Sequence, residues 1–171
     1  MKKNILGLFL LISIFSFSFN SVEQIRTKNN ELSKNNPFKF KGENKGKRAF
    51  SYSWNTVDAN VFYQGNQVTK VEIKGNYIAE QNSGKIFEKF LRELSKIINI
   101  RRLDEIINKS ELMEDYLYNS TDKKQEYLAE TADYRVKLTT RRNLGEFFLG
   151  ATWDSRRTKD KNVLIIEITK K

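Results

Sequence analysis

The apolar residues of this chain change their spacing twice along the sequence. They alternate with polar residues from Ala49 to Gly75, recur with a helical period from Ser83, and alternate again from Tyr134 to Thr169. Alternation is typical of strands with one buried face, and a period of about 3.6 residues is typical of amphipathic helices. The order predicts an α+β fold: an antiparallel sheet of about five to six strands, with about two to three helices inserted between its N-terminal and C-terminal strands and packed on one face.

The first two strands can be placed from their apolar residues. Ala49 to Trp54 carries aromatic residues at every second position, and the apolar positions change parity after Asn55. A turn at Asn55 and Thr56 would pair Trp54 with Val57 and gather the apolar residues of both strands on one face.

The connection to the third strand has two alternatives. A two-residue Gly65-Asn66 turn would place Val61 opposite Lys70, whereas a three-residue loop that includes Gln67 would place Val61 opposite Val71. We expect the three-residue loop, because it keeps one face of the hairpin apolar.

Three helical stretches are predicted next. The second runs from Leu103 to Leu117, and a third, weaker one follows Ser120 or Thr121 and includes Tyr127, Leu128 and Ala132. Because apolar residues at this spacing are typical of a core, we expect no cofactor site among them. The strongest helix begins at Ser83 and carries on one face Ile86, Phe87, Phe90, Leu91, Leu94, Ile97 and Ile98.

Three strands are predicted to close the chain. Residues 134–141 and 147–153 alternate, and a tight loop between them would pair Leu138 with Leu149 and Tyr134 with Trp153. Val163 to Thr169 begins with apolar residues on both sides, which indicates a strand inside the sheet.

Residues 1–21 are typical of a secretory signal peptide. Two lysines precede an apolar run from Ile5 to Phe15, which is shorter than the ~20 residues that a spanning helix needs. Small residues at Ser16 and Ser18 favour cleavage after Ser18, with cleavage after Ser21 as a second choice. We therefore expect an exported protein, periplasmic or secreted; an uncleaved anchor is the alternative.

Residues 22–48 are rich in charge and have no sustained apolar period. They contain eight basic and three acidic residues, a net charge of +5. This composition predicts a flexible basic arm, which could contact a membrane peripherally, ahead of a single α+β domain at 49–171.

The chain contains no Cys and no His. Disulfides, thiolate nucleophiles, His-dependent triads and His-ligated metals are therefore excluded, and the fold must be held by core packing. An enzyme would have to rely on Asp, Glu, Lys or Tyr, or on a metal held by oxygen ligands, so a non-enzymatic function is favoured.

Basic residues gather in the last quarter of the chain. Residues 134–171 have ten basic and four acidic residues, whereas 104–133 have nine acidic and three basic ones. The basic residues predict a surface for an anionic polymer or an envelope surface. Nucleic acid is not favoured, because exposed aromatic residues that would stack on bases are scarce. The candidate residues are Arg135, Lys137, Arg141, Arg142, Arg156, Arg157, Lys159 and Lys161.

Acidic residues at 122, 126, 130 and 133 would form one stripe if their segment is helical. Such a stripe could bind a divalent cation, or be neutralised by the chain's own Arg and Lys, and the second interpretation is favoured. Two functions follow: an exported non-enzymatic binding or envelope-associated protein with an anionic ligand or, as the alternative, a small metal-dependent hydrolase or nuclease. The weak metal candidates are Asp122, Glu126, Glu130 and Asp133.

Overall fold

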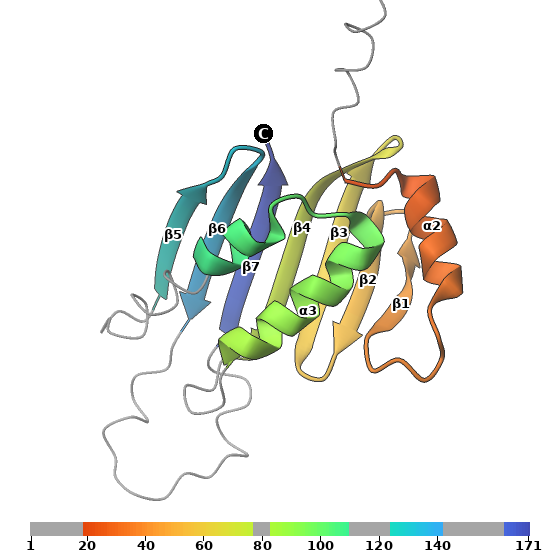
Figure 1. Ribbon diagram of the computed structural model, residues 1–171, viewed down its shortest axis with the longest axis horizontal. Coiled ribbons are helices and arrows are strands. Elements are labelled where there is room, and N and C mark those ends of the chain that lie inside the picture. Colours follow the sequence, from red (N-terminus) through yellow and green to blue (C-terminus); the bar gives the residue numbers. More distant parts are fainter. Residues whose placement is uncertain (1–18, 77–82, 110–123, 142–162) are drawn as a thin grey trace, which may run out of the picture.

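The computed structural model describes residues 19–76, 83–109, 124–141 and 163–171 (Figure 1). The labelled elements are α2 (Val22–Glu31), β1 (Lys39–Asn44), β2 (Ala49–Trp54), β3 (Val57–Gln64), β4 (Gln67–Asn76), α3 (Ser83–Ile98), β5 (Lys124–Glu130), β6 (Tyr134–Arg141) and β7 (Val163–Lys170). Residues 103–109 form one further helix, which has no label in Figure 1.

The strands form one antiparallel sheet in the order β1-β2-β3-β4-β7-β6-β5. The helices lie on one face of the sheet, as Figure 1 shows. The predicted α+β fold is confirmed, as is the place of β7 inside the sheet. The predicted strand number was too low, because the described residues contain seven strands. The two that were not expected, β1 and β5, are the edges of the sheet.

The register of the first hairpins is as predicted. Trp54 pairs with Val57 across the turn at Asn55, whose φ is 53°, a conformation that Asn tolerates better than most residues. Val61 pairs with Val71. The loop that produces this register was predicted wrongly: Gln64 pairs with Gln67, so the turn has two residues.

A bulge in β4 explains why the two-residue turn does not shift the register. Phe62 pairs with Lys70 and Tyr63 with Val68, which leaves Thr69 as the extra residue. Because the bulge absorbs one residue, the strands beyond it keep their apolar residues on one face.

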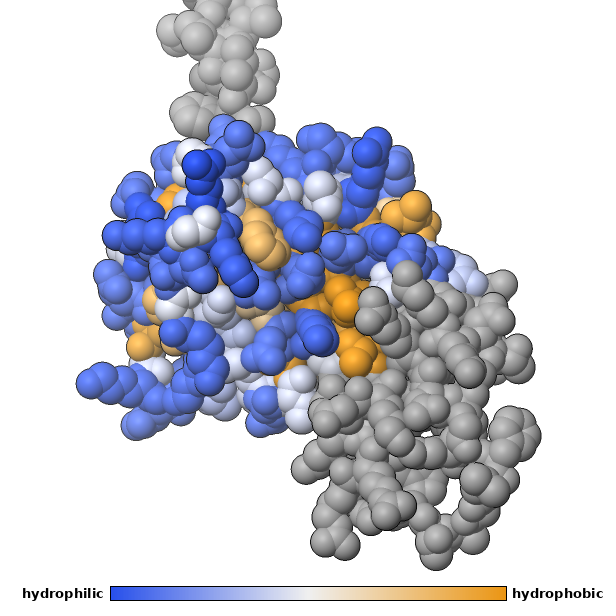
Figure 2. All heavy atoms as spheres, turned by 180° about the vertical axis from the view of Figure 1, so that it is seen from behind, coloured by the Kyte–Doolittle hydropathy of each residue, from blue (hydrophilic) through white to orange (hydrophobic). Residues whose placement is uncertain are grey.

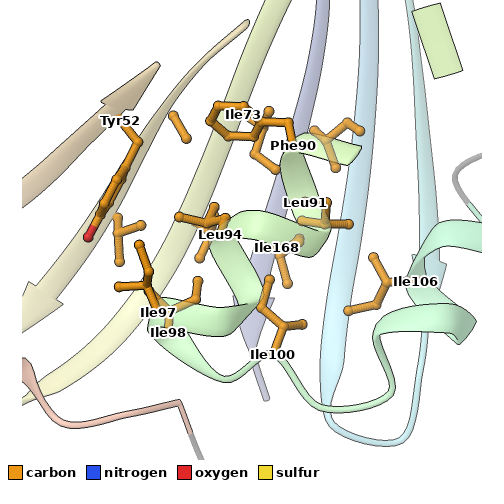
Figure 3. Close-up of a cluster of buried hydrophobic side chains, with 14 of the residues drawn as sticks. Tyr52, Ile73, Phe90, Leu91, Leu94, Ile97, Ile98, Ile100, Ile106 and Ile168 are labelled. Atoms are coloured by element: carbon orange, nitrogen blue, oxygen red, sulfur yellow. The ribbon is translucent and has the colours of Figure 1, made fainter. Parts of the chain in front are cut away.

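The apolar side of α3 packs on the sheet (Figure 3). Phe90, Leu94 and Ile98 are fully buried, and Ile73 and Ile168 on the sheet are buried as well. Beyond the end of α3, Ile106 of the 103–109 helix is also fully buried, and the main-chain N–H of Arg101 donates to the hydroxyl of Tyr134 on β6 over 3.1 Å. One continuous core therefore spans both halves of the sheet. Among the described residues, we find no helix both long and apolar enough to cross a membrane.

Residues 22–48 are not a flexible arm. Ser21 caps α2 by accepting from the main-chain N–H of Gln24, whose side chain accepts from the N–H of Ser21 in return. Val22 and Ile25 on α2, and Phe38 just before β1, are buried. These few apolar residues are enough to attach the segment, because each is almost fully removed from water.

The third predicted helix is also wrong, because residues 124–130 form strand β5. Tyr127 and Ala129 pack against the core, while Leu128 is 76% exposed on the opposite face.

β5 pairs with β6 along its whole length, and β7 occupies the other side of β6. Leu138 therefore faces Tyr127 and Ile166, so the predicted pairing of β6 with residues 147–153 is wrong.

Candidate anion-binding surface

Two of the eight predicted anion-binding side chains can be placed. Arg135 and Lys137 lie on the face of β6 away from the helices, as predicted, because their neighbours Val136 and Leu138 are buried in the core. Arg141 belongs to β6, but its side chain is not described. The remaining five candidates lie outside the described residues: Arg142, Arg156, Arg157, Lys159 and Lys161.

Both placed cations are already paired with carboxylates of β5. Arg135 Nε lies 3.2 Å from Glu130 Oε1, and Lys137 Nζ lies 3.0 Å from Glu126 Oε2. These contacts cross from one strand to its neighbour, so the acidic and basic segments attract each other within the sheet. This part of the face therefore does not offer uncompensated charge to a polyanion.

The three candidate metal ligands that the structure describes, Glu126, Glu130 and Asp133, are paired with cations of the chain. Glu130 also binds Lys171 at 2.8 Å, and this hydrogen bond and charge, together with those of Arg135, lower the pKa of Glu130. Asp133 lies in the β5–β6 turn, 3.7 Å from Arg102. Asp122 lies outside the described residues. Within the described ranges no group of three acidic side chains is placed to hold a metal ion.

At the centre of the sheet face away from the helices, the charge of Lys70 is paired in the same way. Lys70 on β4 lies 3.3 Å from both Glu72 and Glu167, and its ammonium is 4.7 Å from the centre of the Phe62 ring. Figure 2 shows that hydrophilic residues cover most of this face, with a smaller hydrophobic area. Half-buried Val163 and Ile165 of β7 belong to this face by their register opposite Arg141 and Thr139.

An uncompensated basic surface lies instead at the β1 edge. Its residues are exposed, and among the described residues they form no ion pair with a carboxylate. We call it the basic hairpin; it consists of Lys34, Lys39, Lys41, Lys45, Lys47 and Arg48.

The backbone directs these cations outward. Lys41 is the extra residue of a bulge between Phe40 and Gly42, where Gly42 has a φ of 140°, a value that other residues rarely adopt. Residues 45–48 form the turn into β2, and a turn without apolar residues stays in solvent.

The one carboxylate within the hairpin faces the other way. Glu43 accepts hydrogen bonds from the guanidinium of Arg26 on α2, at 2.7 and 3.1 Å, and from the Tyr63 hydroxyl. The Arg26 hydrogen bond is the main cause of a lowered pKa of Glu43, and the charge of Lys45 contributes less. Glu43 therefore anchors β1 to α2, and its charge is already balanced by Arg26.

The basic hairpin was not selected from the sequence, although its segment was recognised as basic. Two signals were present: the pattern Phe38-Lys39-Phe40-Lys41, which alternates as a strand does, and the Ser21-to-Gln24 capping box, which marks a helix start.

Comparisons with models of known protein families, with curated proteins and with solved structures found no match.

Proposed function

We propose that this protein is an exported, non-enzymatic binding protein, periplasmic or secreted, and that its ligand is an anionic polymer. The basic hairpin carries the proposal, because its six exposed cations have no carboxylate partner among the described residues. Cations that are not neutralised by the protein can replace the counterions of a polyanion, and the release of those counterions drives binding.

The shape of the surface favours an extended chain over a flat membrane. Lys39 and Lys41 lie along the edge strand, and Lys45, Lys47 and Arg48 continue the line through its turn. A polymer that runs along this edge would therefore contact several of these cations at once.

Binding of polyphosphate, heparin and anionic vesicles by the full chain at several salt concentrations tests the proposal. Replacing Lys39, Lys41, Lys45 and Lys47 with Gln should weaken binding and flatten its salt dependence, by ~0.7–0.9 in the log–log slope for each lost contact. The control replaces Lys74, Lys89, Lys96 and Lys170, which are also exposed. It changes the net charge equally and should bind almost as the wild type does.

Equal losses in the two variants would mean that net charge alone attracts the polymer, and would overturn the assignment to the hairpin. If the protein bound anionic vesicles but not soluble polymers, its ligand would be a membrane surface and the proposed polymer ligand would be wrong. The cations of residues 156–161 remain a prediction; a variant with Arg156, Arg157, Lys159 and Lys161 changed to Gln tests them in the same assay.

A further inference from the structure

Residues 19–21, which follow the expected cleavage site, are built into the core; we call them the N-terminal segment. The Phe19 side chain is 6% exposed, and its ring centre lies 5.2 Å from that of Tyr134 on β6. The main-chain N–H of Asn20 donates to the carbonyl of Ile98 at 2.8 Å. The third residue of the segment caps α2. The chain is therefore held in place from its first described residue onward.

The N-terminal segment also completes α3. The last four carbonyls of a helix have no partner within it. Asn20 satisfies two of them, because its side-chain Nδ2 donates to Ile97 at 2.6 Å in addition to the main-chain contact with Ile98. Lys28 of α2 donates to a third, the carbonyl of Lys96, at 2.7 Å. α2 thus begins beside the end of α3 (Figure 1), and docking of the segment is part of the packing of α3 on the sheet.

A peptide bond beside docked residues is protected from proteolysis. A protease acts on a chain that is extended and accessible, and a folded domain supplies such a chain only by local opening. To bring the bond between Ser18 and Phe19 into an active site, the ring of Phe19 has to leave the core. Asn20 has to release both of its carbonyl partners on α3. The rate of cleavage of the folded chain is then limited by the fraction of time for which the segment is undocked.

We propose that removal of the signal peptide and folding compete at this bond. Docking of the N-terminal segment protects the cleavage site, so the signal peptide is removed only from a chain whose segment is still undocked. Hydrolysis adds water across the bond: the carbonyl carbon of Ser18 gains the hydroxyl, and the nitrogen of Phe19 gains the proton.

A chain that docks the segment first keeps residues 1–18, and with them an apolar run that holds it at the membrane. The released form and the anchored form, which are the two alternatives from the sequence, are thus two outcomes of one competition. This inference rests on the proposed export of the chain.

Two substrates with the same cleavage sequence test the proposal. One is the full chain, folded in detergent micelles; the other is a synthetic peptide of residues 1–30, which lacks α3 and β6 and so has nothing on which to dock. Purified signal peptidase is added to both, and mass spectrometry measures the rate and the position of the cut. The peptide should be cut after Ser18. The folded full chain should be cut at least about tenfold more slowly, the effect of a segment that is docked for about nine-tenths of the time or more.

Substitutions in the segment separate docking from recognition by the peptidase. Phe19→Ala and Asn20→Ala are made in both substrates, because these residues also lie next to the cut. The ratio of the full-chain rate to the peptide rate then reports docking alone, and both substitutions should raise it severalfold. The control is Val57→Ala in the full chain. It removes a buried side chain at the end of β3 far from the segment and should leave the ratio unchanged.

A full chain that is cut as fast as the peptide would overturn this inference and leave the proposed export intact. Equal increases for Val57→Ala and Phe19→Ala would also overturn it, because the cut would then follow unfolding of the whole domain. A cut of the peptide after Ser21 would have the same consequence, since the segment itself would be removed. If the peptide is not cut at all, the proposed export fails together with this inference. Binding of polymers by the hairpin variant is a separate measurement and decides the rest of the proposed function.

Discussion

Gly75 of β4 and Phe87 of α3 are in direct contact where the helix meets the sheet. A Cβ at position 75 would lie 2.8 Å from Cζ of Phe87 and 3.2 Å from a methyl group of Val57. Phe87 is 4% exposed, so its ring is held by the core and has little room to move. The absence of a side chain at Gly75 thus sets how closely α3 approaches the sheet.

Gly75→Ala should therefore lower the free energy of unfolding by ~1–3 kcal/mol, the usual effect of overpacking a core. Urea unfolding measures this effect, and a double-mutant cycle with Phe87→Leu should show a coupling between the two positions. Gly46→Ala is the control, because its Cβ would meet only Asn44 Oδ1 at 3.5 Å. An effect of Gly75→Ala no larger than that of Gly46→Ala would contradict the close contact.

Stability should fall at high pH because of Tyr52. Burial raises the pKa of this phenol above its ordinary value. A raised folded-state pKa leaves stability intact below the unfolded pKa of ~10 and removes it as the pH rises further, because the unfolded chain then ionises first. Tyr52→Phe should flatten this decline in urea unfolding measured on both sides of pH ~10. If the stability of Tyr52→Phe declined as steeply as that of the wild type, Tyr52 would not be the cause. The decline would then belong to Tyr63 and Tyr134, whose pKa values are also raised.

Acid should weaken the attachment of β1 through Glu43. The folded-state pKa of Glu43 is lowered, chiefly by the hydrogen bond from Arg26, so its stabilising effect is present above the ordinary carboxyl pKa of ~4.3 and is lost as the pH falls further. Glu43→Gln should thus destabilise the protein near neutral pH and have a smaller effect in acid. The control is Glu31→Gln, an exposed residue of the same helix that contains Arg26. The idea is wrong if the gap between Glu43→Gln and the wild type is the same at both pH values.

The part of the fold from β2 to α3 could be predicted from the sequence because its apolar pattern is long and uninterrupted. The Val61–Val71 register was correct because a one-residue shift would have exposed the core face. The loop was not, since the bulge at Thr69 leaves no pattern in the sequence and compensates for the shorter turn.

The edge elements could not be predicted in this way. The acidic residues of β5 are spaced four apart, as on a helix, yet in the strand Glu126 and Glu130 both face cations of β6. Pairing with a neighbouring strand outweighed local propensity there. β1 shows the same limit: only Phe38 and Phe40 mark it as a strand, and the residues that hold it, Arg26 and Tyr63, come from distant positions. The basic hairpin was missed because its segment was interpreted by composition alone.

The final prediction concerns the cleavage site of the proposed signal peptide: we expect cleavage after Ser18, so that the mature chain begins at Phe19. The Phe19 side chain is buried and its ring centre lies 5.2 Å from that of Tyr134. The main-chain N–H of Asn20 donates to the carbonyl of Ile98 at 2.8 Å, and Ser21 caps α2. Cleavage after Ser18 would keep all of these contacts, whereas cleavage after Ser21 would remove them.

N-terminal sequencing of the protein recovered from the exporting cell should therefore find Phe19 first. A chain that begins at Val22 should be less stable in urea than one that begins at Phe19, by ~1 kcal/mol for the lost cap and by more for the buried ring. Ser21→Ala in the longer chain isolates the contribution of the cap. An exported protein that begins at Val22 and is as stable as the longer chain would show that residues 19–21 are not needed, and that the helix start is held by Val22 and Ile25 alone.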